Sequence, residues 1–112
     1  MKFIIAIIQP HRLDAVREAL LGIGVNGLTV TEVRGYGRQK GQKEIYRGAE
    51  YTISFVPKLK VEIAIVSERA EDVINAVQNA ARSGKVGDGK IFVLDLLQAV
   101  RVRTGEADAD AL

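Results

Sequence analysis

The sequence predicts an α+β fold in which two helices cover one face of a four-stranded antiparallel sheet. Three observations indicate it: two amphipathic helical patterns, four short apolar or β-branched runs, and the order strand, helix, strand repeated twice. The order βαββαβ is that of a ferredoxin-like fold, in which helices lie on one face of the sheet only. Because the predicted strands are so apolar, we expect another subunit to cover the open face.

The elements of the first half follow directly from local patterns. Residues 3–8 form a continuous apolar run that is too short for a membrane span and ends at Gln9 and Pro10, so they predict a buried strand. From residue 13 apolar side chains recur at helical spacing until a group of glycines ends the helix. Residues 28–34 are rich in β-branched side chains and predict the second strand.

The second half repeats this order. Residues 56–66 alternate between polar and apolar positions, which predicts the third strand. Residues 70–81 carry a second helical stripe, and Ser67 is the expected N-cap of that helix. The apolar run at residues 91–97 predicts the fourth strand, again buried.

Composition limits the function classes. A chain of 112 residues, of which 47% are hydrophobic, has the size of a single domain, residues 1–112. The net charge of +2 is too balanced to indicate nucleic acid or an anionic membrane. Without cysteine the chain has no disulfide or thiolate metal site, and its single histidine, His11, cannot form a zinc site alone. Because no signal-peptide pattern is present, we expect a soluble, cytoplasmic protein.

The segment 82–90, with the sequence RSGKVGDGK, places three glycines and two lysines between the second helix and the last strand. Glycines let backbone N–H groups turn toward a phosphate, and lysines add positive charge. The segment leaves a helix and enters a strand, so it is neither a Walker-type nor a dinucleotide-binding loop. It predicts a phosphate site, with a helix-ending glycine and a tight turn as the alternative.

Residues 35–54 show no periodicity and are too many for a hairpin turn. Loops of this length usually serve as lids or binding elements or are disordered, so we predict a long functional loop over about residues 36–55. It contains all three tyrosines, Tyr36, Tyr46 and Tyr51, each of which could be modified, meet a partner or pack against the body. A C-terminal tail, about residues 98–112, follows the last strand.

Charged side chains two positions apart share one face of a strand. Arg101 and Arg103 would therefore project together and suit a polyphosphate, with a solvated edge strand as the alternative. Lys58 and Glu62 would likewise share the polar face of the third strand. That face is either part of a binding site or an ordinary half-solvated surface.

Two long motifs, YRGAEY at residues 46–51 and SGKVGDGKIF at residues 83–92, resemble the signature segments of the PII signal-transduction proteins of nitrogen regulation. Residues 1–8, 27–41 and 100–112 share the resemblance. It implies a homotrimer of ferredoxin-like subunits that binds ATP or ADP between neighbouring subunits. The residues that match the nucleotide positions are Gly87, Asp88, Gly89 and Lys90 at the phosphates, Arg101 and Arg103 from the adjacent subunit, Thr29, Glu62 and Ala64 around the adenine, and Gly37, Arg38 and Gln39 at the base of the long loop.

The resemblance also implies that 2-oxoglutarate binds through a magnesium ion shared with the ATP phosphates. Gln39, Lys58 and Gly87 are at the matching positions, with Gln39 as the metal ligand. The oxygens of an amide, phosphates and a keto acid suit Mg²⁺, and Lys58 would neutralise the distal carboxylate. Magnesium-ATP with the keto acid would hold the long loop in one arrangement and ADP in another. The implied protein is a regulator with at most slow ATP hydrolysis.

The partners implied by the resemblance are an ammonium transporter, whose pore Arg47 at the loop tip would enter, and enzymes of the uridylyltransferase and adenylyltransferase types. Tyr51 matches the tyrosine that receives a uridylyl group in many relatives, a change that adds bulk and negative charge. We expect no nucleic-acid partner, and membrane contact only through a channel. The chain departs from the usual pattern at Gln9, where relatives are commonly basic, and at His11, where they are commonly aromatic.

Two other functions fit the predicted fold. The first is an enzyme of nucleotide phosphate chemistry, with Asp88 or Glu62 as a base. The second is an RNA-binding module, which would stack bases on aromatic side chains of the sheet. Phe3 and Phe92 lie in apolar runs that we expect to be buried, and this argues against the second function.

Overall fold

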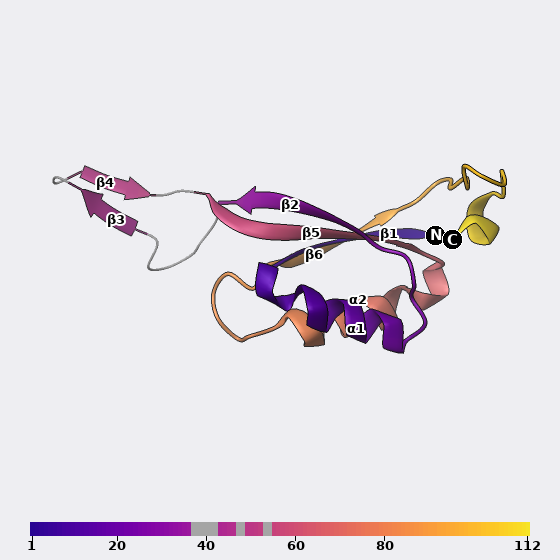
Figure 1. The fold of residues 1–112 in the computed structure, drawn as a ribbon, viewed down its shortest axis with the longest axis horizontal. Helices are drawn as coiled ribbons and strands as arrows, with labels where there is room; N and C mark the ends of the chain where they lie inside the picture. The colour runs from indigo at the N-terminus through magenta and orange to yellow at the C-terminus, as the bar shows by residue number, and fades with distance from the viewer. Residues whose placement is uncertain (37–42, 47–48, 53–54) are drawn as a thin grey trace.

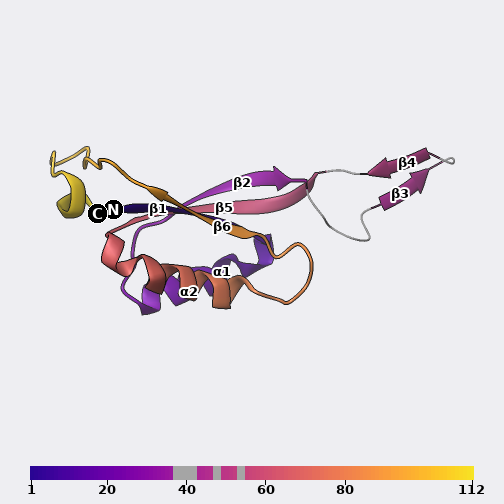
Figure 2. The same cartoon turned by 180° about the vertical axis from the view of Figure 1, so that it is seen from behind.

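The computed structural model describes residues 1–112 except 37–42, 47–48 and 53–54. A four-stranded sheet has two helices against one of its faces (Figures 1 and 2). Its elements along the chain are β1 (Lys2–Ile8), α1 (Leu13–Gly22), β2 (Thr29–Gly35), β3 (Lys43–Tyr46), β4 (Ala49–Thr52), β5 (Val56–Ile65), α2 (Ala70–Ala81) and β6 (Lys90–Asp95). Neither helix within these described ranges has the length and apolarity needed to cross a bilayer.

The main sheet has the strand order β2-β5-β1-β6, and all neighbouring strands are antiparallel. This confirms the predicted α+β arrangement of two helices and four antiparallel strands. β3 and β4 pair with each other in a separate two-stranded sheet. The segment predicted as one long loop therefore contains two short strands, with Tyr46 opposite Ala49 and Glu44 opposite Tyr51.

The core lies between the helices and the sheet. In β1 and β5 every second residue is buried there, while each helix contributes one stripe, as the sequence periodicity predicts. The buried hydrophobic residues are Ile4, Ala6, Ile8, Val16, Leu20, Val25, Leu59, Val61, Ile63, Ala70, Val73, Val77 and Ala81. Truncation of a fully buried side chain such as Leu20 to alanine would cost roughly 2–5 kcal/mol.

The opposite face of the sheet is open, and the side chains that β1 and β6 place on it are mostly apolar. Ile5 of β1 pairs with Phe92 of β6, and Phe3 pairs with Leu94, so these side chains share the face that points away from the helices. Phe92 and Leu94 are each 48% exposed. The predictions that residues 91–97 form a buried strand and that Phe92 is buried are therefore wrong, because β6 is an edge strand and no element that the structure describes covers this face.

Two local predictions are also wrong. Ser67 does not cap α2 with its side chain, because it lies within a short 3-10 turn, Ser67–Arg69, that precedes the helix. Arg101 and Arg103 do not lie on a strand, since residues 102–104 form a turn in which the Gly105 N–H donates to the Arg101 carbonyl at 2.8 Å. The strand argument that placed the two arginines on one face therefore fails.

Candidate functional site

The predicted phosphate loop connects α2 to β6. The backbone is in the left-handed region at Gly84, Gly87 and Gly89, where φ is 85°, 102° and 104°. At Gly89 a side chain is also excluded by space, because a Cβ atom would lie 1.7 Å from the carbonyl oxygen of Ile7. Gly89 thus lets the loop contact the end of β1, which a side chain at this position would prevent.

Asp88 holds this loop in shape. Its carboxylate accepts hydrogen bonds from the backbone N–H groups of Ser83 at 2.8 Å and Gly84 at 2.9 Å, and from the Ser83 hydroxyl. The Ser83 hydroxyl is the largest cause that lowers the pKa of Asp88, and the backbone donors and the nearby charge of Arg12 add to it. The ionised Asp88 side chain therefore holds the loop through hydrogen bonds. A phosphate bound here would contact the loop backbone.

The carbonyl of Gly87 is held by a residue that follows β1 and by a residue of β5. It accepts a hydrogen bond from the side-chain amide of Gln9 at 2.8 Å and another from the ammonium of Lys58. Lys58 is only 6% exposed, and burial lowers its pKa while the charge of Asp88 opposes that shift. A buried ammonium bound to a neutral carbonyl has no full charge compensation. Lys58 is therefore placed to take a carboxylate, and it is not part of a half-solvated surface.

A second group of predicted residues lies elsewhere on the sheet. Thr29 of β2 pairs directly with Glu62 of β5, and both line a cavity of about 650 Å³ together with Ala64. Ala109, Ala111 and Leu112 of the C-terminal segment also contribute to its wall. The volume is in the range of small-molecule sites, which are typically about 300–1,000 Å³.

The C-terminal arginines lie far from the glycine loop. The N–H of Leu96 donates to the carbonyl of Met1, so the tail continues beside the start of β1, at the end of the sheet opposite the glycine loop (Figure 1). Arg101 donates to the Glu106 carboxylate at 3.1 Å and to the Ala111 carbonyl at 3.4 Å. Arg103 is exposed in the turn. One chain alone does not bring these arginines to residues 87–90.

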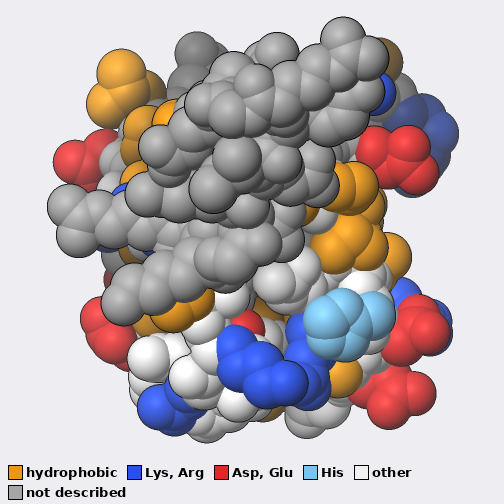
Figure 3. All heavy atoms as spheres, turned by 90° about the vertical axis from the view of Figure 1, so that its left-hand side faces the viewer, with side chains coloured by type: hydrophobic (Ala, Val, Ile, Leu, Met, Phe, Trp, Pro, Cys, Tyr) orange, Lys and Arg blue, Asp and Glu red, His pale blue; other side chains and the backbone are white. Residues whose placement is uncertain are grey.

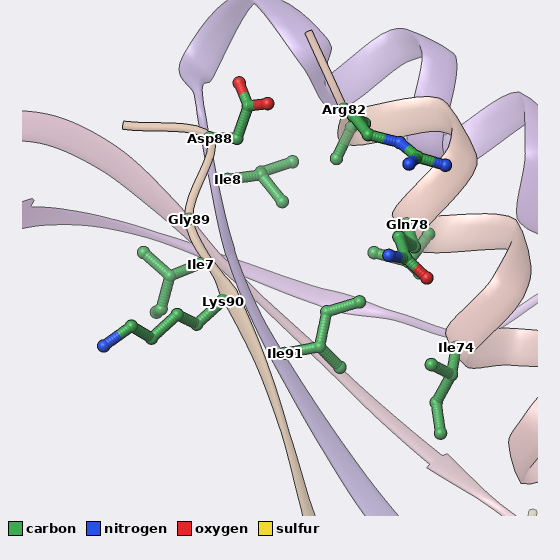
Figure 4. Close-up of a pocket in the computed structure, with 11 residues that line it drawn as sticks. Ile7, Ile8, Ile74, Gln78, Arg82, Asp88, Gly89, Lys90 and Ile91 are labelled. Atoms are coloured by element: carbon green, nitrogen blue, oxygen red, sulfur yellow. The ribbon is translucent and has the colours of Figure 1, made fainter. Parts of the chain in front are cut away.

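A smaller cavity of about 350 Å³ lies between α2 and the β1–β6 edge (Figure 4). Ile74 and Gln78 come from the helix and Arg82 directly follows it, whereas Lys90 of the strand projects away from the helix. The end of the molecule that carries the glycine loop shows basic side chains beside the histidine (Figure 3). Lys90 pairs with Ile7, so its side chain belongs to the open face of the sheet.

Four predicted residues, Gly37, Arg38, Gln39 and Arg47, lie outside the described part of the chain. Tyr51 lies in β4. Sequence reasoning missed the parts played by Gln9 and Ser83. The serine had a local signal, since it lies five residues before an aspartate in a glycine-rich turn. Gln9 had none, because its partner, Gly87, is 78 positions away.

Known proteins match this chain over most or all of its length. Residues 1–106 match the family described as Nitrogen regulatory protein P-II. The chain is 60% identical to the nitrogen regulatory protein P-II of Rhizobium etli and 56% identical to the nitrogen regulatory protein GlnK of Escherichia coli K12, over 112 residues in each case. It is 55% identical to the P-II protein of Rhizobium meliloti, and all three alignments cover both chains completely. The chain therefore belongs to the P-II family of nitrogen regulatory proteins and is a regulator in nitrogen signalling.

Proposed function

We propose that this regulator is a homotrimer that binds ATP or ADP between subunits, binds 2-oxoglutarate with magnesium, and signals through residues 36–55. The observation that carries the proposal is the Gly87 carbonyl in the glycine loop, held by the buried ammonium of Lys58. The loop suits a polyphosphate and the adjacent ammonium suits a carboxylate. One site could thus take both kinds of ligand.

The open sheet face supports the homotrimer. Phe92 and Leu94 are about half exposed, and Leu97 is 91% exposed. Contiguous apolar surface of this kind usually marks an interface. Assembly would also solve the separation of the site residues, since Arg101 and Arg103 of one subunit would reach residues 87–90 or the Thr29 and Glu62 cavity of its neighbour.

The magnesium ion is proposed from the chemistry of its donors. Mg²⁺ prefers hard oxygen ligands and often takes only one or two from the protein, with the rest from phosphates and water. The amide oxygen of Gln39 would be such a ligand. The ion would join the phosphates to the keto acid, while Lys58 would receive the distal carboxylate.

The partners are proposed from the resemblance to PII proteins. An ammonium transporter would contact the segment that contains Arg47, and a uridylyltransferase would modify Tyr51. An enzyme of the adenylyltransferase type would bind the same segment. A switch between ATP and ADP would change the arrangement that these partners bind.

A nucleotide phosphate enzyme is the second candidate, and the structure disfavours Asp88 as its base. The Asp88 carboxylate accepts three hydrogen bonds and its pKa is lowered, so it is a weak proton acceptor near neutral pH. We expect phosphate release far slower than about 1 s⁻¹, a low value for an enzyme. Faster steady turnover would support the enzyme.

Calorimetric titration of 2-oxoglutarate tests the proposal. Binding should be strong with magnesium-ATP and weak with ADP or without nucleotide, with a coupling of roughly 1–3 kcal/mol. Lys58→Met should abolish keto-acid binding and leave ATP binding measurable, while Lys60→Met on the same strand is the control. Equal binding under all three conditions, or a monomeric mass in solution, would contradict the proposal.

A further inference from the structure

We propose that Gln9 is a positioning residue of this site. It keeps the Gly87–Asp88 peptide oriented toward a phosphate when Lys58 moves to the dicarboxylate. This inference rests on the proposed function. Its basis is the pair of donors on one carbonyl, of which one is a charged ammonium and the other a neutral amide.

The backbone of Gln9 is held between β1 and the 3-10 turn that follows it. It follows directly on β1, and its φ and ψ of −66° and 138° are those that a following proline favours. Its own carbonyl accepts the N–H of Arg12 at 3.0 Å, which closes the 3-10 turn at Pro10–Arg12. Its side chain does not cap that turn and donates to Gly87 instead. The side-chain amide of Gln9 therefore takes no part in the 3-10 turn and donates to the glycine loop instead.

The hydrogen bond to Gly87 also fixes the next N–H group. The carbonyl of Gly87 and the N–H of Asp88 belong to one trans peptide and point in opposite directions. Because the carbonyl points toward Gln9 and Lys58, the Asp88 N–H points away from them. Among the described residues this N–H donates no hydrogen bond to a backbone carbonyl. It is therefore available to a phosphate oxygen, provided that the peptide does not rotate.

A bound carboxylate would affect the two donors, the Lys58 ammonium and the Gln9 amide, differently. A carboxylate is a stronger partner for an ammonium than a neutral carbonyl is, so a dicarboxylate would draw Lys58 away from Gly87. The amide of Gln9 carries no charge and would stay. With ATP alone, two donors hold the peptide. With the keto acid bound as well, Gln9 holds it alone, so the side chain should matter most in the ternary complex.

Gln9→Met tests this, because methionine keeps the length of the side chain and removes the donor. We expect ATP affinity without keto acid to change by less than about two-fold, and the enhancement of 2-oxoglutarate binding by ATP to fall about five-fold or more, the size of one net hydrogen bond. Gln9→Leu, which also lacks a donor, should give the same loss. Gln78→Met, an exposed glutamine on α2, is the matched control.

The outcomes separate the inference from the proposed function. If the natural chain itself shows no dependence of keto-acid binding on ATP, the proposed function fails and this inference with it. If that dependence is present, the inference is wrong should Gln9→Met leave it unchanged or reduce ATP binding alone by the same factor. Thermal unfolding and native mass of each variant show whether it is folded and assembled, and a misfolded Gln9→Met leaves Gln9→Leu as the second variant without a donor.

Discussion

The two helix-to-strand connections occupy equivalent places in the two halves of the fold, and they are closed by different means. After α1, the Val25 N–H donates to the Leu20 carbonyl at 2.9 Å, and the Val25 side chain is 5% exposed. After α2, Ser83 and Gly84 donate to the Asp88 carboxylate, and Val86 is 58% exposed. The first connection ends a helix with backbone bonds and a buried side chain. The second is held by the Asp88 side chain, and under the proposed function its remaining backbone N–H groups would contact a phosphate.

The largest expected effect comes from adding a methyl group to the second connection. Gly89→Ala should prevent folding or lower the free energy of unfolding by more than about 3 kcal/mol, because its Cβ would overlap the Ile7 carbonyl at a positive φ. Gly84→Ala has free space and should cost only about 1–2 kcal/mol for its positive φ. Denaturant unfolding measures both.

Gly22→Ala is the control for this pair, since it lies in α1 with open space around it. It should stabilise the chain by roughly 0.5–1 kcal/mol. Equal losses at positions 84 and 89 would show that the contact with β1 does not constrain the second connection.

An intermediate effect should distinguish the two valines. Val25→Ala in the first connection removes a buried side chain and should lower the free energy of unfolding by roughly 1–3 kcal/mol. Val86→Ala in the second is exposed and should change it by less than about 0.5 kcal/mol. Thermal unfolding of the two variants gives the comparison, and similar losses would mean that both connections are held by apolar packing.

The smallest effect concerns the hydrogen bonds of the Asp88 carboxylate and depends on pH. The pKa of Asp88 is lowered in the folded chain, so its carboxylate stabilises the fold above its unfolded pKa, about 4, and this contribution is lost as pH falls through the folded pKa. Ser83→Ala should reduce stability at neutral pH by at most about 1 kcal/mol. Asp88→Asn should show a smaller loss of stability on acidification than the natural chain.

Glu18→Gln on the exposed face of α1 is the matched control for the charge change. Urea unfolding between about pH 5 and pH 3 covers the window in which an aspartate with a lowered pKa takes up its proton. An Asp88→Asn profile that runs parallel to that of the natural chain would mean that the carboxylate does not hold the loop.

The fold could be predicted from the sequence because its elements have strong local periodicity. Val16 and Leu20 in α1 and Val73 and Val77 in α2 lie at helical spacing, and all are buried. The burial of β6 could not be predicted from its own pattern. An apolar run such as residues 91–97 indicates that a strand will be covered, but it does not say whether the same molecule covers it.

The candidate site could be predicted in part. Glycines and lysines at residues 82–90 indicated the loop, but its contacts with Gln9 and Lys58 depend on how β1 and β5 end beside it. Such long-range contacts leave no local pattern. The prediction that Arg101 and Arg103 lie on a strand is wrong, because alternation of charged and apolar residues also occurs in a turn that Gly105 closes.

The hydrogen bond from Arg101 to Glu106 has a consequence for any anion that approaches the tail. The guanidinium already has a carboxylate partner, so an incoming anion must displace that partner before it gains the full attraction. A single small anion would gain little from the exchange, whereas a chain of phosphates that contacts several donors together would gain more. Under the proposed function the internal carboxylate would therefore favour polyphosphates over the simple anions of the surrounding solution.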